Sequence, residues 1–273
     1  MTLPAHAEAR NGQNQELSST DRAVRADWSA YSSAYDLLSD HNPEYQALLH
    51  DFEAFLGTIE APNVIYDIGG GTGNYTEIAA RNCPESKIHL MEPDAQMIRS
   101  AESKLASYDN VTFNSIALEN IEASGTADLV ICVHALYAMP GQAERLNDLH
   151  RLLRPGGHLY LIDLGRYMNV SDWRAYLFSE LRREHGLKEA LKIFWQGREV
   201  AKQNKAILKA QKKGVYWTHS ATEIAESVTA AGFEIIRQQS VYRDHSDLIV
   251  CRAIKNNRPE AENQSWNSMS SRR

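Results

Sequence analysis

The sequence predicts an α/β protein whose seven strands form one mixed sheet, with a helical cap inserted late in the chain. The first observation is a strand that turns through glycines directly into a helix at residues 63–80. The second is the alternation of short apolar runs with amphipathic segments, which is typical of a parallel sheet covered by helices. The third is a pair of strand-like runs at residues 233–254, separated by a turn so short that the two strands must be antiparallel.

Length and composition favour one large domain. The chain has 273 residues, 43% of them hydrophobic, and we place the domain at residues 19–254 with the cap at 166–217. The polar segments 1–18 and 255–273 are predicted to be disordered tails. The net charge of −6 gives no whole-chain sign of nucleic-acid binding, and the three cysteines lack metal-type spacing. Because no apolar run reaches membrane-spanning length and no secretion signal opens the chain, we expect a cytoplasmic protein without stable membrane insertion.

The N-terminal part of the domain carries an aromatic stripe. Residues 19–22 are predicted to cap a helix on which Trp28, Tyr31 and Tyr35 recur at roughly helical spacing. Asn42-Pro43 interrupts this helix, and an amphipathic helix resumes at residues 45–57. We expect Trp28 to pack against the sheet.

The stretch NVIYDIGGGTGNYT, residues 63–76, predicts a ligand site. Residues 64–68 form an apolar strand, and Gly69, Gly70, Gly71 and Gly73 follow it before a helix resumes at Glu77. Glycines allow positive φ and close approach of a ligand, and the helix N-terminus points free N–H groups at that ligand. Asp67, just before the turn, suits an amine-bearing ligand better than a pyrophosphate.

A second strand, residues 87–91, ends in Glu92. A carboxylate about 20 residues past such glycines suits the hydroxyls of a ribose. Two other interpretations stay open, namely a solvated strand end and a partner for the N-terminus of the predicted helix 94–105.

The next elements continue the alternation. A third strand begins at Val111, and the unbroken apolar strand 128–133 opens onto a loop with His134 and Tyr137, where ligands of open α/β sheets bind. Helix 142–153 is predicted to end at the turn 154–157, before the strand 158–163. Asp163 and Tyr167, at the exit of that strand, either face an acceptor or are solvated.

The last elements close the sheet. Helix 218–231 carries a capping box, Ser220 with Glu223, and precedes strands 233–241 and 247–254.

The cap segment is strongly basic. Residues 174–213 hold eleven Lys/Arg against four Glu, a local charge of +7 that leaves −13 for the rest of the chain. Three interpretations stay open: a solvated helix face, a surface that rests on an anionic membrane, or attraction of an anionic acceptor whose apolar body packs against Trp173, Phe194 and Trp195. Tyr216, Trp217 and His219, just past the cap, are further candidates for a pocket wall.

Four motifs in order, DIGGGTGNYT, HLMEPDAQMI, ADLVICVHALYAMP and LRPGGHLYLIDLG, resemble class I S-adenosylmethionine (SAM)-dependent methyltransferases. The resemblance is strong over residues 60–165 and looser over 218–254. It implies a Rossmann-like class I methyltransferase fold and metal-independent transfer of a methyl group from SAM to an O or N atom, with C as a lesser expectation. The acceptor would be a small organic molecule, with anionic and aromatic compounds as candidates.

The resemblance also implies site residues. The glycine turn would hold the methionine end of SAM, Asp67 its ammonium group, and Glu92 the ribose. Ile116 occupies the position where many relatives carry an Asp for the adenine amino group. The implied cofactor-binding set is Asp67, Gly69, Gly71, Gly73, Tyr75, Glu92, Pro93, Met97, Ile116, Ala117, Val133 and His134.

The same resemblance suggests catalytic and acceptor residues. His134, Tyr31 and Tyr137 are the catalytic candidates, because an imidazole can take a proton near neutrality. In-line methyl transfer from an activated sulfonium can also proceed by alignment alone, so a base is optional. The candidate acceptor residues are Tyr35, Tyr167, Trp195 and Tyr216.

Two other functions are carried as alternatives. One is an NAD-dependent oxidoreductase that uses the same turn and Glu92, which the antiparallel end strands disfavour. The other is a non-catalytic SAM-binding or membrane-associated module. We expect a small-molecule partner and no nucleic acid or metal, and a homodimer stays open.

Overall fold

The computed structural model describes residues 25–254, and the predicted tails 1–18 and 255–273, with the capping residues 19–22, lie outside this range. One seven-stranded sheet has the order β3-β2-β1-β4-β5-β7-β6, with β7 antiparallel to both of its neighbours. The strands are β1 (Val64–Ile68), β2 (Lys87–Met91), β3 (Val111–Asn114), β4 (Ala127–Val133), β5 (Leu153–Asp163), β6 (Phe233–Val241) and β7 (Ser246–Ala253). The predicted mixed sheet is confirmed, and an all-parallel dinucleotide-binding sheet is excluded.

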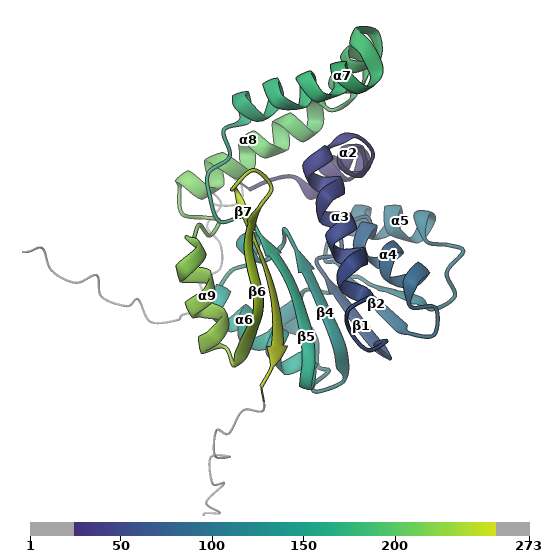
Figure 1. Cartoon of the computed structure of the whole chain (residues 1–273), viewed down its shortest axis with the longest axis vertical. Coiled ribbons are helices and arrows are strands. Elements are labelled where there is room, and N and C mark those ends of the chain that lie inside the picture. Colours follow the sequence, from purple (N-terminus) through teal and green to yellow (C-terminus); the bar gives the residue numbers. More distant parts are fainter. Residues whose placement is uncertain (1–24, 255–273) are drawn as a thin grey trace, which may run out of the picture.

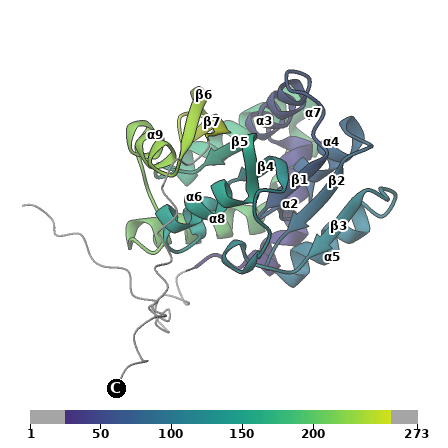
Figure 2. The same ribbon diagram turned by 90° about the horizontal axis from the view of Figure 1, so that it is seen from below.

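Helices cover both faces of this sheet (Figures 1 and 2). They are α2 (Trp28–His41), α3 (Pro43–Leu56), α4 (Asn74–Asn82), α5 (Ala95–Lys104), α6 (Gln142–Leu152) and α9 (Ala221–Ala230), with short 3-10 turns η1 (Leu118–Asn120) and η2 (Leu136–Ala138). Residues of β4 alternate between the two apolar layers: Leu129 and Ile131 pack on one side, and Val130 and Cys132 on the other. Each such fully buried aliphatic side chain contributes about 1.5–3 kcal/mol.

Local signals fix most helix ends. Asn42 and Asp94 accept hydrogen bonds from the first turns of α3 and α5. Ser220 and Glu223 form the predicted capping box, so α9 begins at Ala221 and not at residue 218. The start of β5 was also predicted wrongly: this strand already begins at Leu153, because the Arg154–Gly157 segment forms a bulge against β4 within the strand and does not precede it as a free turn.

Two helices occupy the segment expected to be a cap. Both α7 (Val170–Gln196), which kinks at Gly186, and α8 (Arg198–Lys212) lie beyond one end of the sheet, next to α2 (Figure 1). Many of their basic side chains face outward, and Arg183, Lys192 and Lys202 pair with Glu180, Glu189 and Glu199. Within residues 25–254 no helix has both the length and the apolarity needed to cross a bilayer.

Candidate functional site

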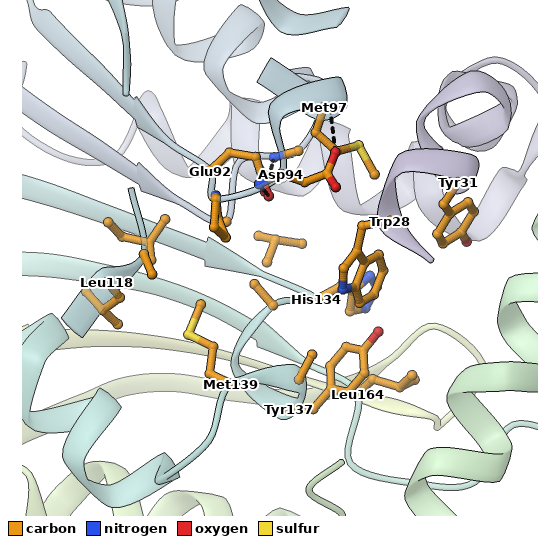
Figure 3. Close-up of a pocket in the computed structure, with 18 of the residues that line it drawn as sticks. Trp28, Tyr31, Glu92, Asp94, Met97, Leu118, His134, Tyr137, Met139 and Leu164 are labelled. Atoms are coloured by element: carbon orange, nitrogen blue, oxygen red, sulfur yellow. Dashed lines mark hydrogen bonds between the residues drawn. The ribbon is translucent and has the colours of Figure 1, made fainter. Parts of the chain in front are cut away.

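The main cavity lies where β1, β2 and β4 end, and α2 and α8 border it. Its volume is about 430 Å³, within the range of pockets that bind drug-sized ligands. In Figure 3, Glu92 and Asp94 lie across the cavity from Tyr137 and Leu164. The lining comprises Arg25, Trp28, Tyr31, Tyr35, Ile68, Gly69, Gly71, Met91, Glu92, Pro93, Asp94, Met97, Ile116, Ala117, Leu118, Glu119, Val133, His134, Ala135, Tyr137, Ala138, Met139, Pro140, Leu164, Met168, Asn204, Ile207 and Tyr242.

The glycine turn forms the floor of this cavity. Gly69 and Gly71 have φ values of 66° and 58°, which favour glycine. A Cβ atom on Gly69 would lie 2.6 Å from the Cβ atom of Ala135, so the absence of a side chain lets the β4–η2 loop approach the turn. Gly73 does not line the cavity; a Cβ there would lie 2.7 Å from Leu105, and this glycine allows α4 and α5 to pack closely.

Glu92 projects from the end of β2 into the same space. Its Oε2 accepts a hydrogen bond from the Gly71 N–H at 3.2 Å, and its Oε1 accepts one from the Asp94 N–H at 2.8 Å. Burial raises the pKa of Glu92 to about 7 despite these two donors. A ligand that donates further hydrogen bonds to this buried carboxyl group would stabilise its charged form.

An apolar slot continues from Glu92. Ile116 and Ala117 line it together with Met91, Leu118 and Met139. Because the Ile116 side chain cannot accept a hydrogen bond, recognition of a flat ring in this slot would depend on packing and on main-chain groups.

Aromatic side chains from α2 form the opposite wall. Trp28 and Tyr31 stack with ring centroids 6.0 Å apart, and Tyr31 meets Tyr35 edge-on at 5.2 Å. Trp28 packs against the apolar core as expected, and its ring also borders the cavity. The Ser29 hydroxyl donates a hydrogen bond of 2.7 Å to Asp94, the residue that caps the N-terminus of α5. This bond connects α2 to the start of α5 at the edge of the cavity.

Comparison with known proteins agrees with this arrangement. A family model of a methyltransferase domain matches residues 66–159. A ubiquinone/menaquinone biosynthesis C-methyltransferase of Hydrogenovibrio crunogenus is 26% identical over 45% of this chain and 50% of its own length. A ubiquinone biosynthesis O-methyltransferase of Cupriavidus pinatubonensis is 26% identical over 68% of this chain and 72% of its own length. The N-methyltransferase NodS of Bradyrhizobium japonicum, solved with S-adenosyl-L-homocysteine, matches with a TM-score of 0.57 at 14% identity over 84% of this chain and 100% of NodS.

Residues 66–159 match a methyltransferase domain, and the chain has the fold of SAM-dependent methyltransferases. The resemblance of the four motifs is therefore confirmed, and with it the expectation of SAM as the cofactor. The chain spans only about half the length of the first of these relatives. Their names include C-, O- and N-methyltransferases, so they do not distinguish the acceptor atom.

Two residues expected to contact the cofactor lie behind the glycine turn. Asp67 is buried and accepts a hydrogen bond from the Thr76 hydroxyl at 2.6 Å, and burial raises its pKa to about 6. Tyr75 packs against Phe52, with ring centroids 5.2 Å apart, on the sheet face that α3 covers. Neither side chain lines the cavity. Asp67 and Tyr75 can therefore affect a ligand only indirectly, by holding the glycine turn in position.

His134 lines the cavity in an unusual backbone conformation, with φ of 50°. Its Nε2 atom lies 2.9 Å from the Ser246 hydroxyl, and its ring packs on Tyr242 at 5.0 Å. Burial lowers the pKa of His134 to about 4, so the imidazole is neutral at pH 7 and a weak proton acceptor. This geometry favours local shaping of the loop over the general-base interpretation.

Three of the four candidate acceptor residues lie outside the main cavity. Tyr167 and Trp195 are 51% and 66% exposed on the surface. Tyr216 is buried behind Tyr137, and its hydroxyl accepts a hydrogen bond from the Ala26 N–H. The acceptor assignments of Tyr167, Trp195 and Tyr216 are therefore corrected, whereas Tyr35 lines the cavity as expected.

A buried polar network holds the η2 loop from behind. Asp163 accepts a hydrogen bond from the Tyr137 N–H at 3.0 Å and lies 3.3 Å from the Nε2 atom of His219. Asp163 was expected at a solvated or acceptor-facing strand end, and His219 at a pocket wall, but both are buried away from the cavity. They position Tyr137 and do not touch the ligand space.

Several lining residues escaped the sequence interpretation. Asn204 and Ile207 come from α8, Tyr242 from the β6–β7 turn, and Met168 from the segment before α7. Nothing in their local sequence distinguishes them from packing residues. Only the polar Asn204 on the inner face of an otherwise amphipathic helix gives a weak signal.

Proposed function

We propose that this protein transfers the methyl group of SAM to an O or N atom of a small organic molecule. The observation that carries the proposal is one cavity that combines the glycine turn and Glu92 with an aromatic, hydroxyl-bearing wall from α2. A ligand between these walls has polar groups of the chain at one end and ring faces at the other.

The residues present fit the cofactor. Gly71 leaves room beside the turn, Glu92 offers carboxylate oxygens for the two ribose hydroxyls, and Ile116 with Ala117 supplies a flat apolar slot for adenine. When bound, SAM supplies an electrophilic methyl group on a positively charged sulfur.

The aromatic wall would serve methyl transfer in two ways. The faces of Trp28 and Tyr35 attract a positive charge, and the wall keeps water from the acceptor. SAM held here would supply the methyl carbon to a lone pair of the acceptor atom and would keep the sulfur as the leaving group. An amine acceptor would then lose a proton to solvent, whereas an ionised oxygen would have none to lose. Alignment of the two reacting atoms in the cavity supplies much of the rate.

The titration of the lining groups favours a mechanism without a strong base. Burial raises the pKa of Tyr31 and Tyr137 well above the usual range, so both phenols stay protonated and donate hydrogen bonds. The Tyr31 hydroxyl already donates to the Oδ1 atom of Asn204 at 3.3 Å. Because His134 is a weak base, the acceptor must react in its deprotonated form, as an uncharged amine or an ionised oxygen.

Calorimetric titration with SAM, S-adenosyl-L-homocysteine and NAD in parallel tests the proposal. We expect micromolar binding of both sulfur nucleotides and none of NAD, followed by transfer of labelled methyl to amines or phenols in an acceptor screen. Binding of NAD alone would overturn the proposed activity and leave the fold assignment standing.

A further inference from the structure

A second cavity of about 110 Å³ lies in the cap, between α7, α8 and the end of α2. Its walls are largely apolar and include Leu177, Leu181, Ile193, Phe194 and Val200. A dry apolar cavity of about 150 Å³ can hold benzene, so this space suits a short alkyl segment.

The second cavity adjoins the first. The two cavities share three lining residues, Met168, Asn204 and Tyr242. The cap cavity therefore borders the main cavity at these residues. Because the main cavity has the volume of a single drug-sized ligand, the cofactor would take up much of it. An acceptor larger than a few atoms therefore has to extend into neighbouring space, and the cap cavity offers that space.

Two arginines mark the outer end. Arg174 and Arg198 line the cap cavity, yet both are exposed, so their guanidinium groups lie at its rim. They stack on the rings of Phe194 and Trp195 at 4.7 and 4.2 Å, which orders the guanidinium planes. Arg198 Nη1 donates a hydrogen bond to the Trp195 carbonyl oxygen at 3.4 Å, and the other N–H groups of the two guanidinium groups can donate to an oxyanion. Unlike Arg183 and Lys192, neither forms an ion pair with a carboxylate within residues 25–254.

We propose that the cap cavity is an acceptor subsite for a short apolar segment that ends in a carboxylate or phosphate. The methyl-accepting end enters the main cavity past Asn204 and Tyr242, and the anionic end stays at Arg174 and Arg198. This inference rests on the proposed function for the identity of the ligand as acceptor, but the subsite itself can be tested without methyl transfer.

The test is calorimetric titration of the full-length protein with hexanoate, hexyl phosphate, 1-hexanol and hexyltrimethylammonium, each with and without S-adenosyl-L-homocysteine. We expect both anions to bind about five- to tenfold more tightly than 1-hexanol and the cation not to bind measurably. Tighter binding of hexyl phosphate than of hexanoate would identify a phosphate end, and the reverse a carboxylate end. A cation that binds as well as the anions would overturn the proposal.

Matched variants locate the site. Arg174→Gln with Arg198→Gln should remove the preference for anions, whereas Arg183→Gln with Lys192→Gln removes the same charge from the same cap and should leave it unchanged. If the two pairs of substitutions had equal effects, the overall charge of the cap would explain the preference for anions, and the subsite would be contradicted.

The apolar wall is tested separately. Ala201→Phe should fill the cavity and weaken hexanoate binding about tenfold, and Ala175→Phe on the exposed side of α7 serves as its control. In the wild-type protein, affinity should rise about fourfold for each methylene from propanoate to hexanoate. Affinity without dependence on chain length contradicts the subsite even if the filled variant does not fold.

The two proposals fail in different ways. Hexanoate binding without nucleotide binding would leave the subsite standing and refute the methyltransferase activity. Nucleotide binding without hexanoate binding would refute only the subsite.

Discussion

Replacing Glu92 by glutamine is the most direct test of the cofactor site. The change keeps the shape of the side chain but removes its charge and one acceptor oxygen. In the wild type the two carboxylate oxygens accept from the N–H groups of Asp94 and Gly71 at 2.8 and 3.2 Å. An amide accepts through one oxygen only, so the substituted side chain cannot serve both N–H groups and two ribose hydroxyls.

The expected loss of affinity follows from these contacts. A hydrogen bond to a charged group contributes about 1.5–3 kcal/mol, so the variant should bind a ribose-containing ligand about 10- to 150-fold more weakly. The wild type should also show a pH dependence that the variant lacks. Burial raises the pKa of Glu92 to about 7, and ligand hydroxyls favour the carboxylate, so affinity should fall about tenfold from pH 8 to pH 6.

The assay is calorimetry with 5′-methylthioadenosine at pH 6, 7 and 8. This ligand keeps the ribose and adenine and has no group that titrates in this range. Glu53→Gln is the control, because Glu53 forms an exposed ion pair with Arg81 at 2.9 Å on the surface of the protein. Equal affinities of wild type and Glu92→Gln at pH 8, or the same pH slope in both, would refute the assignment of Glu92.

Three further substitutions test other parts of the site. Burial raises the pKa of Asp67 to about 6, so its contribution to stability is complete below about pH 4 and lost as pH rises through 6. In urea unfolding, Asp67→Asn should therefore gain about 1.4 kcal/mol on the wild type between pH 5 and pH 7.5; a constant difference contradicts this. Gly69→Ala should lower stability and nucleotide affinity, because its Cβ would lie 2.6 Å from the Cβ atom of Ala135. Gly125 has a similar φ of 64° and no atom within 4 Å of the added Cβ, so Gly125→Ala should show only the backbone cost of about 1–3 kcal/mol. Equal losses of the two variants in thermal melts and in binding would argue against the contact with Ala135. His134→Asn, which tolerates positive φ, should keep the single-turnover methyl-transfer rate at pH 7 within about tenfold of wild type; a loss of about 100-fold or more would restore the general-base role.

The sequence was sufficient to predict the elements that build the cofactor side. Glycines follow an apolar strand at Gly69 and Gly71, and the acidic residue at the next strand end, Glu92, lies in the same cavity. These features depend on local backbone freedom and on the parallel arrangement of neighbouring strands. A short segment of sequence is sufficient to predict both of these properties. The capping box of Ser220 and Glu223 was predictable for the same reason.

Only the tertiary structure decided which aromatic and polar side chains line the cavity. Trp28 and Trp195 both lie on helices, yet docking of α2 turns the first into the cavity while α7 leaves the second in solvent. Asn204 and Tyr242 line the main cavity although they come from segments far apart in the chain. The weak basicity of His134 likewise follows from burial by distant residues. A side chain's neighbours across the fold, and the water they exclude, depend on how rigid elements are rotated against one another, and local periodicity does not encode that rotation.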